Sequence, residues 1–160
     1  MKVLMVCTGN ICRSPMMERV AAAYATREGI DVKITSGGTS SEESSNPIDH
    51  RARRVLERAG YDASNHRAHQ VSAKEVADAD LVIAAEDHHR QRLLRLAPQA
   101  DVRLLSAFDP DLPAGTGLPD PWYGPPEEFD ETLTAVEAAM PGLMAYLKER
   151  TSWEPVVRPG

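Results

Sequence analysis

The residues best suited to chemistry lie near the start of the chain, in segment 7–14, which reads Cys-Thr-Gly-Asn-Ile-Cys-Arg-Ser. The segment directly follows the apolar run 3–6 and precedes a helix-like run that begins at Pro15. Backbone N–H groups converge at such a strand-to-helix turn, and the start of the helix adds positive potential. An anion pocket of this kind stabilises a thiolate relative to a thiol. We therefore expect Cys7 to be a nucleophile aimed at phosphorus or a similar tetrahedral oxyanion.

The pattern of a strand, Cys-x5-Arg-Ser and a helix resembles the low-molecular-weight protein tyrosine phosphatase family. The match is specific because Gly9, Asn10 and Ser14 are filled as that family fills them, and it covers nearly the whole chain. The resemblance implies hydrolysis of phosphotyrosine in proteins through a phosphocysteine on Cys7, with no cofactor and no metal ion. It makes Arg13 the second catalytic residue and assigns the rest of the loop to substrate binding: Thr8, Gly9, Asn10, Ile11, Cys12 and Ser14.

A thiolate that attacks a phosphate monoester must expel an alkoxide or a phenoxide, and a general acid makes that step feasible. Segment 120–123, Asp-Pro-Trp-Tyr, lies in a proline-rich stretch and resembles the family's loop that carries this acid. By that resemblance Asp120 protonates the leaving group and then acts as base on the water that cleaves phosphocysteine. Asp109 and Asp111 are candidates by composition alone. Trp122 and Tyr123 are expected to line the pocket mouth, where flat walls favour aryl phosphates.

Residues outside the loop are expected to support it. Asn10 resembles the family's loop-shaping asparagine; His66 falls where the family often has a histidine that supports it, and Ser36 falls where a hydroxyl joins the same network. Ser14 is expected to donate a hydrogen bond to the thiolate. His66 is not expected to bind zinc, because no Cys/His cluster has metal-ligand spacing. Three other histidines are expected to be surface residues: His69, His88 and His89.

One departure from the family bears on substrate range. Glu42 occupies a place where many family members carry an aromatic rim residue, and Glu43 follows it. If this segment forms the rim of the pocket, the two carboxylates should discourage acidic peptides around a phosphotyrosine.

The elements that must position these residues alternate between strand and helix. Apolar or alternating runs predict strands at 2–6, 32–35, 81–85 and 102–105. Helical spacing predicts helices at 15–28, 47–59, 87–96 and 127–150, with a short helix that begins at Ser72. Segments 36–46 and 108–126 are expected to be irregular loops. This alternation predicts one α/β domain whose parallel sheet is covered by helices on both faces, and the resemblance implies a flavodoxin-like strand order, 2-1-3-4.

In such a sheet the right-handed crossovers place the carboxyl ends of all strands at one edge, where ligands bind. The residues that follow the four predicted strands should therefore meet at one edge: Cys7, Ser36, Glu86 and the proline-rich loop.

Composition narrows the class of protein further. The 160 residues fit a single domain, 1–150, followed by a frayed tail, 151–160. A net charge of −6 argues against nucleic-acid binding, and no apolar stretch is long enough for a membrane span. Two reduced cysteines fit a cytoplasmic protein, expected as a monomer or weak homodimer. Peroxide is expected to join Cys7 and Cys12 in a disulfide, because a thiolate is the form that is oxidised.

Two other functions compete with phosphatase activity. An arsenate reductase can use a similar loop on the same fold. One form needs additional cysteines late in the chain, and this chain has none after Cys12; a form that uses a small external thiol would not need them, but it would not need Asp120, Pro121 and Trp122 either. A non-catalytic phosphotyrosine-binding module could keep Arg13 and the loop amides, yet it would be free to lose Cys7 and Asp120. Both residues are present, so we expect an active enzyme. Assays with an aryl phosphate and with arsenate would separate the three functions.

Overall fold

Four parallel strands form one sheet in the order β2-β1-β3-β4, in a computed structural model that describes residues 1–152. The strands are β1 (Lys2–Cys7), β2 (Lys33–Gly38), β3 (Leu81–Ala84) and β4 (Val102–Leu104). Strand β1 pairs with β2 and β3, with Cys7 beside Gly38 and Met5 beside Ile83. The expected fold class and the strand order 2-1-3-4 are confirmed.

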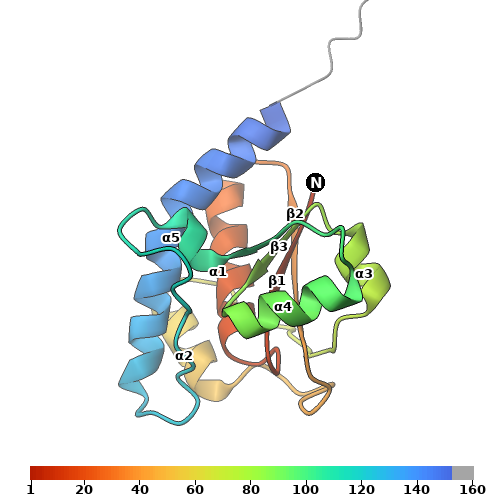
Figure 1. The fold of residues 1–160 in the computed structure, drawn as a ribbon. Coiled ribbons are helices and arrows are strands. Elements are labelled where there is room, and N and C mark those ends of the chain that lie inside the picture. Colours follow the sequence, from red (N-terminus) through yellow and green to blue (C-terminus); the bar gives the residue numbers. More distant parts are fainter. Residues whose placement is uncertain (153–160) are drawn as a thin grey trace, which may run out of the picture.

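Helices cover both faces of this sheet (Figure 1). One face carries α1 (Arg13–Arg27), α2 (His50–Arg58) and α5 (Glu127–Ser152), which contact one another. The other face carries α3 (Ala73–Asp78) and α4 (Asp87–Leu96), and a 3-10 turn η1 (Leu105–Phe108) follows β4. No helix within residues 1–152 is long and apolar enough to cross a bilayer.

The buried strands supply side chains to two separate cores. Along β1, Val3 and Met5 pack under α1 and α5, whereas Leu4 and Val6 pack under α3 and α4. Strand β3 alternates in the same way. Successive side chains of a strand point to opposite faces, so a continuous apolar run is what a strand covered on both faces requires.

Gly38 at the end of β2 allows two backbones to approach closely at the carboxyl edge of the sheet. Just after it, the Thr39 N–H donates to the Cys7 carbonyl at 2.9 Å, and the Ser40 N–H donates to the Thr8 carbonyl at 3.0 Å. A Cβ on Gly38 would lie 2.5 Å from the Thr8 carbonyl oxygen. Glycine therefore lets β2 lie directly against the start of loop 7–14.

Several element boundaries differ from those expected. Segment 36–38 belongs to β2 rather than to a loop, because its backbone pairs with β1, and glycines leave no side-chain pattern to read. Helix α1 begins at Arg13 rather than at Pro15. Proline has no backbone N–H, but the N–H groups of a helix's first turn have no partner inside the helix, so Pro15 fits as its third residue. Turn η1 includes Phe108, where the sequence predicts the start of an irregular loop. Residues 151–152 extend α5, and the rest of the expected tail lies outside the described residues.

Asp49 fixes the start of α2 and ties it to loop 7–14. Its carboxylate accepts from the backbone N–H of Arg51 at 2.8 Å and of Ala52 at 3.4 Å, and its own N–H donates to the Ile11 carbonyl at 2.8 Å. Burial alone would raise the pKa of Asp49, but its hydrogen bonds and ion pair with Arg51 outweigh burial and lower it.

We expect Asp49→Ala to lower the free energy of unfolding by about 1 kcal/mol, because the helix loses its side-chain cap. Asp49→Asn keeps the cap oxygen and should lose clearly less. Because the folded-state pKa is depressed, the carboxylate's contribution should be present above about pH 4 and decline as the pH falls through the folded-state pKa. Urea denaturation of wild type and the two variants measures the free energy of unfolding. If both variants lose the same amount, the stabilisation comes from the ion pair with Arg51 rather than from the helix cap.

Candidate active site

The Cys7 sulfur lies at the base of a pocket formed by loop 7–14. Its Sγ is 3.1 Å from the Ser14 Oγ, with which it shares a hydrogen bond, and it accepts from the Ser14 backbone N–H at 3.3 Å. The Ser14 Oγ in turn accepts from Asn10 Nδ2 at 2.8 Å. That bond occupies an acceptor position on the hydroxyl and leaves the Ser14 proton free for a thiolate. The loop therefore provides two donors for a negative sulfur, and both come from the first turn of α1.

Asn10 holds the loop in its shape from beneath. Its backbone has φ of 59°, in the left-handed region that asparagine tolerates better than most residues. Its fully buried side chain donates to the hydroxyls of Ser14 and Ser36, at 2.8 and 3.0 Å, and accepts from the His69 backbone N–H at 3.1 Å. The Asn10 carbonyl lies 2.6 Å from the His66 Nε2. The structure thus brings Asn10, Ser14, Ser36 and His66 into one network.

The side chains of this network do not line the pocket itself. The side chains of Asn10 and Ser14 are fully buried and hold the loop rather than line the pocket, and the expectation that these two residues bind substrate stays a prediction. Burial lowers the pKa of His66, against the opposing effect of its bond to the Asn10 carbonyl. A neutral His66 can still donate through Nε2, so the support does not require a charge.

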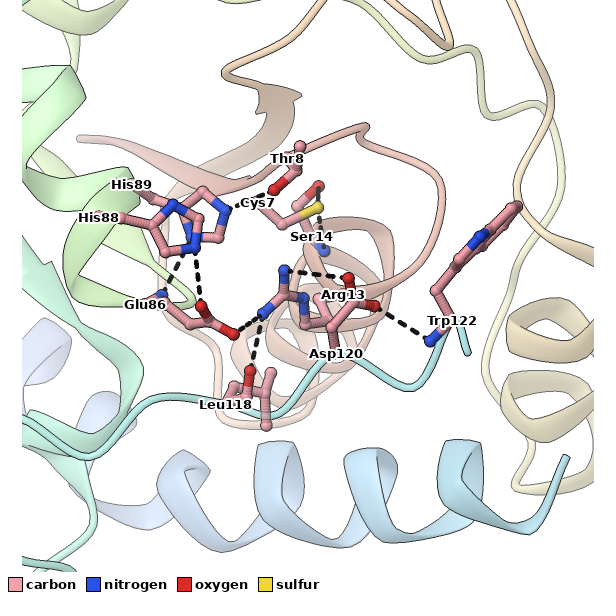
Figure 2. Close-up of polar contacts among 10 residues, drawn as sticks. All are labelled: Cys7, Thr8, Arg13, Ser14, Glu86, His88, His89, Leu118, Asp120 and Trp122. Atoms are coloured by element: carbon pink, nitrogen blue, oxygen red, sulfur yellow. Dashed lines mark hydrogen bonds and ion pairs between the residues drawn. The ribbon is translucent and has the colours of Figure 1, made fainter. Parts of the chain in front are cut away.

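Arg13 is the buried cation of the pocket and is only 3% exposed. Its Nη1 donates to Glu86 Oε1 at 2.5 Å and to the Leu118 carbonyl at 2.7 Å, and its Nη2 lies 3.7 Å from Asp120 Oδ2 (Figure 2). Burial alone would raise the pKa of Glu86, but Arg13 and His88 outweigh burial and lower it. Sequence reasoning placed Glu86 at this edge of the sheet but missed its ion pair with Arg13.

Asp120 stands at the pocket mouth on the long loop before α5. One carboxylate oxygen accepts from the Trp122 backbone N–H at 3.1 Å, and the side chain is 42% exposed. Asp109 is instead buried at the end of η1, where it accepts from the Asp111 N–H at 3.0 Å. Asp109 and Asp111 do not line the pocket with Cys7, whereas Asp120 does.

The rim combines aromatic and acidic side chains. Trp122 and Tyr123 line the pocket, as do Glu42 and Glu43 from the loop after β2. The Arg51 guanidinium lies 5.1 Å from the centre of the Trp122 ring and donates to the Trp122 carbonyl at 3.2 Å. Through this contact, α2 holds the loop that carries Asp120 and Trp122. The remaining lining residues come from loop 7–14: Thr8, Gly9, Ile11, Cys12 and Arg13.

The expectation that His88 and His89 are both surface residues is wrong for His89. Its side chain is fully buried, and its Nε2 lies 2.8 Å from the Thr8 Oγ1 (Figure 2). Its position at the start of α4, which follows β3 at the carboxyl edge, is the signal that could have placed it near the loop. His88 and His69 are exposed, and each pairs with a glutamate, Glu86 and Glu75 respectively.

Cys12 differs from Cys7 in its surroundings. Burial, followed by the negative charge of Asp49, raises the pKa of the Cys12 thiol far above its usual range. Cys12 therefore remains a neutral thiol in the resting protein, and the expected disulfide with Cys7 stays a prediction. Within residues 1–152, no group of three or more His, Cys, Asp and Glu side chains is arranged to hold a metal ion.

Comparisons with known proteins agree with this geometry. The family model described as low molecular weight phosphotyrosine protein phosphatase matches residues 2–152. The low molecular weight protein-tyrosine phosphatase A of Mycobacterium tuberculosis is 40% identical over 154 residues, which cover 92% of each chain.

Several solved structures share the fold. A protein tyrosine phosphatase of Entamoeba histolytica has a TM-score of 0.87 and 27% identity, covering 94% of this chain and 98% of that one. The YwlE arginine phosphatase of Bacillus subtilis has a TM-score of 0.86 and 27% identity, covering 96% of this chain and 100% of that one. That second structure is a cysteine-to-serine variant whose active-site serine is phosphorylated. With its Cys-x5-Arg loop, the chain belongs to the low molecular weight protein-tyrosine phosphatase family of enzymes.

Proposed function

We propose that this phosphatase hydrolyses aryl phosphate monoesters, phosphotyrosine in proteins above all, through a phosphocysteine on Cys7. One observation carries the proposal: the Cys7 sulfur, the Arg13 guanidinium and the Asp120 carboxyl line the same pocket. A nucleophile, a cation for the phosphoryl oxygens and a proton donor for the leaving group are the parts that the reaction needs.

The first step transfers the phosphoryl group to sulfur. The Cys7 thiolate attacks phosphorus, a P–S bond forms, and the bond between phosphorus and the aryl oxygen breaks. Asp120 gives its proton to that oxygen, so a neutral phenol leaves. The guanidinium of Arg13 offers parallel N–H groups to the phosphoryl oxygens. Its ion pair with Glu86 orients it before substrate arrives.

The second step returns the enzyme to its starting state. The Asp120 carboxylate takes a proton from water, the water oxygen attacks phosphorus, and the P–S bond breaks to release inorganic phosphate. The hydroxyl and the N–H of Ser14 both face the sulfur that leaves. By stabilising the thiolate, they make sulfur a better leaving group. The phosphorylated active-site serine of the YwlE variant supports a covalent intermediate at this position.

The rim supports a preference for aryl phosphates. Trp122 and Tyr123 give the mouth a flat apolar wall, and Tyr123 is 92% exposed. Stacking and apolar burial against such walls stabilise a tyrosyl ring more than a seryl chain. An arsenate reductase remains the competing activity on this fold. Turnover of aryl phosphate without reduction of arsenate would support the proposal, and the reverse result would overturn it.

Cys7→Ser should abolish turnover of an aryl phosphate, with kcat falling by at least roughly a thousandfold. A serine hydroxyl is a poor nucleophile at neutral pH, whereas the loop amides and Arg13 remain able to bind phosphate. Steady-state kinetics and calorimetric titration with orthophosphate measure the two effects. Substantial turnover by the variant would rule out a covalent intermediate on Cys7.

Asp120→Asn should slow hydrolysis of substrates with poor leaving groups by roughly a hundredfold or more, and of nitrophenyl phosphate much less. A nitrophenolate hardly needs a proton, whereas a tyrosyl oxygen does. Hydrolysis rates are measured with a series of aryl phosphates whose phenols increase in pKa. The rate should fall more steeply with phenol pKa for Asp120→Asn than for wild type. Asp111→Asn serves as the matched control. An equal loss for all leaving groups would reduce Asp120 to a positioning role.

Replacing Glu42 and Glu43 by lysine should raise kcat/KM for phosphopeptides with acidic flanking residues by roughly two- to fivefold, mainly through KM. The carboxylates now on the rim repel such peptides, and added salt should shrink the gain because it screens exposed charges. Peptides with neutral flanks are the control. If the ranking of acidic and neutral peptides does not change, these two side chains do not contact the substrate's flanks.

A further inference from the structure

We propose that His89 is a positioning residue that fixes the Thr8 hydroxyl so that it donates a hydrogen bond to the phosphoryl group. The inference rests on the proposed function, since it requires a phosphoryl group in the pocket that Thr8 lines. Thr8 immediately follows the nucleophile, and His89 reaches it from the first turn of α4, on the far side of Cys7 from Trp122 (Figure 2).

The hydrogen bonds of His89 determine which ring nitrogen carries the proton. The Glu86 backbone N–H donates to the His89 Nδ1 at 3.1 Å, so Nδ1 is an acceptor and has no hydrogen. Burial, aided by the charges of His88 and Arg13, lowers the pKa of His89 to about 3, so the ring is neutral near pH 7. A neutral imidazole protonated on one nitrogen only must then carry its hydrogen on Nε2.

The proton on Nε2 sets the direction of the Thr8 hydroxyl. The Nε2–H donates to the Thr8 Oγ1 across 2.8 Å. The hydroxyl uses a lone pair for that bond, so its own hydrogen points away from His89. Among the described residues, the bond to His89 is the one hydrogen bond found for the Thr8 hydroxyl. Because Thr8 is exposed at the pocket surface, an anionic oxygen in the pocket is the acceptor that this hydrogen is free to meet.

His89 also has a purely structural contact, since its Nδ1 caps the start of α4 through the Glu86 N–H. Two variants separate the cap from the contact with Thr8. In His89→Asn, the side-chain oxygen can take the place of Nδ1 and keep the cap, but no atom reaches Thr8. In His89→Gln, the terminal amide nitrogen can take the place of Nε2 and donate to Thr8, while the acceptor at Nδ1 is lost.

The test compares wild type with His89→Asn, His89→Gln, Thr8→Val and Thr8→Ser. Each protein is assayed for kcat and KM with an aryl phosphate, for direct calorimetric binding of orthophosphate and for melting temperature. We expect His89→Asn to weaken orthophosphate binding and lower kcat/KM by roughly tenfold, as for loss of a hydrogen bond to a charged group. His89→Gln and Thr8→Ser should retain most of both, and Thr8→Val should match His89→Asn. The double variant His89→Asn with Thr8→Val should lose no more than either alone, because the two residues act through one bond.

The inference is overturned if His89→Asn binds orthophosphate as tightly as wild type, or if its loss adds in full to that of Thr8→Val. A lower melting temperature for His89→Gln than for His89→Asn, with unchanged phosphate affinity in both, would reduce His89 to a helix cap. Failure of wild type to hydrolyse any aryl phosphate would contradict the proposed function instead, and the binding measurements would still report on His89.

Discussion

The fully buried side chain of Asn10 is the contact on which the active-site loop depends. Asn10, at φ of 59°, turns the backbone of loop 7–14. Its bonds to Ser14, Ser36 and His69 use both N–H donors and the carbonyl oxygen of the side chain. Those partners come from α1, β2 and the segment that precedes α3. A loop fixed from three directions can keep its N–H groups directed at one point before any anion arrives, which is how preorganised sites avoid a reorganisation cost.

Charge is arranged around the same loop in two layers. Arg13 is almost fully buried and is held by Glu86 and the Leu118 carbonyl, so the cation is oriented by groups that lie behind the pocket. The carboxylates that face the mouth are Asp120, Glu42 and Glu43. A net acidic protein can thus bind a dianion at the base of its pocket while the rim discriminates among the surroundings of that dianion.

The alternation of strands and helices and the place of the pocket could be predicted from the sequence, because both follow from local patterns, whereas the strand order was implied by the resemblance to the family. Apolar runs gave the strands, and Cys-x5-Arg-Ser between a strand and a helix located the pocket. The resemblance anticipated the contacts of Asn10 with Ser36 and His66, but other contacts between distant segments left no direct signal in the sequence. The ion pair of Arg13 with Glu86 and the bond of Thr8 with His89 join residues more than seventy positions apart. The extension of β2 through 36–38 was missed because two glycines carry no pattern, although β1 pairs with them.

In the proposed reaction the phosphoryl group is first transferred to the Cys7 sulfur. Trapping that phosphocysteine tests the mechanism most directly. Wild type is mixed with an aryl phosphate, quenched within the first turnover, digested and examined by mass spectrometry under conditions that preserve phosphocysteine. We expect a phosphoryl group on the peptide that contains Cys7, formed at least as fast as phenol is released and lost as free phosphate appears. Full-rate release of phenol and phosphate together, with no phosphorylated Cys7 at any time, would contradict it.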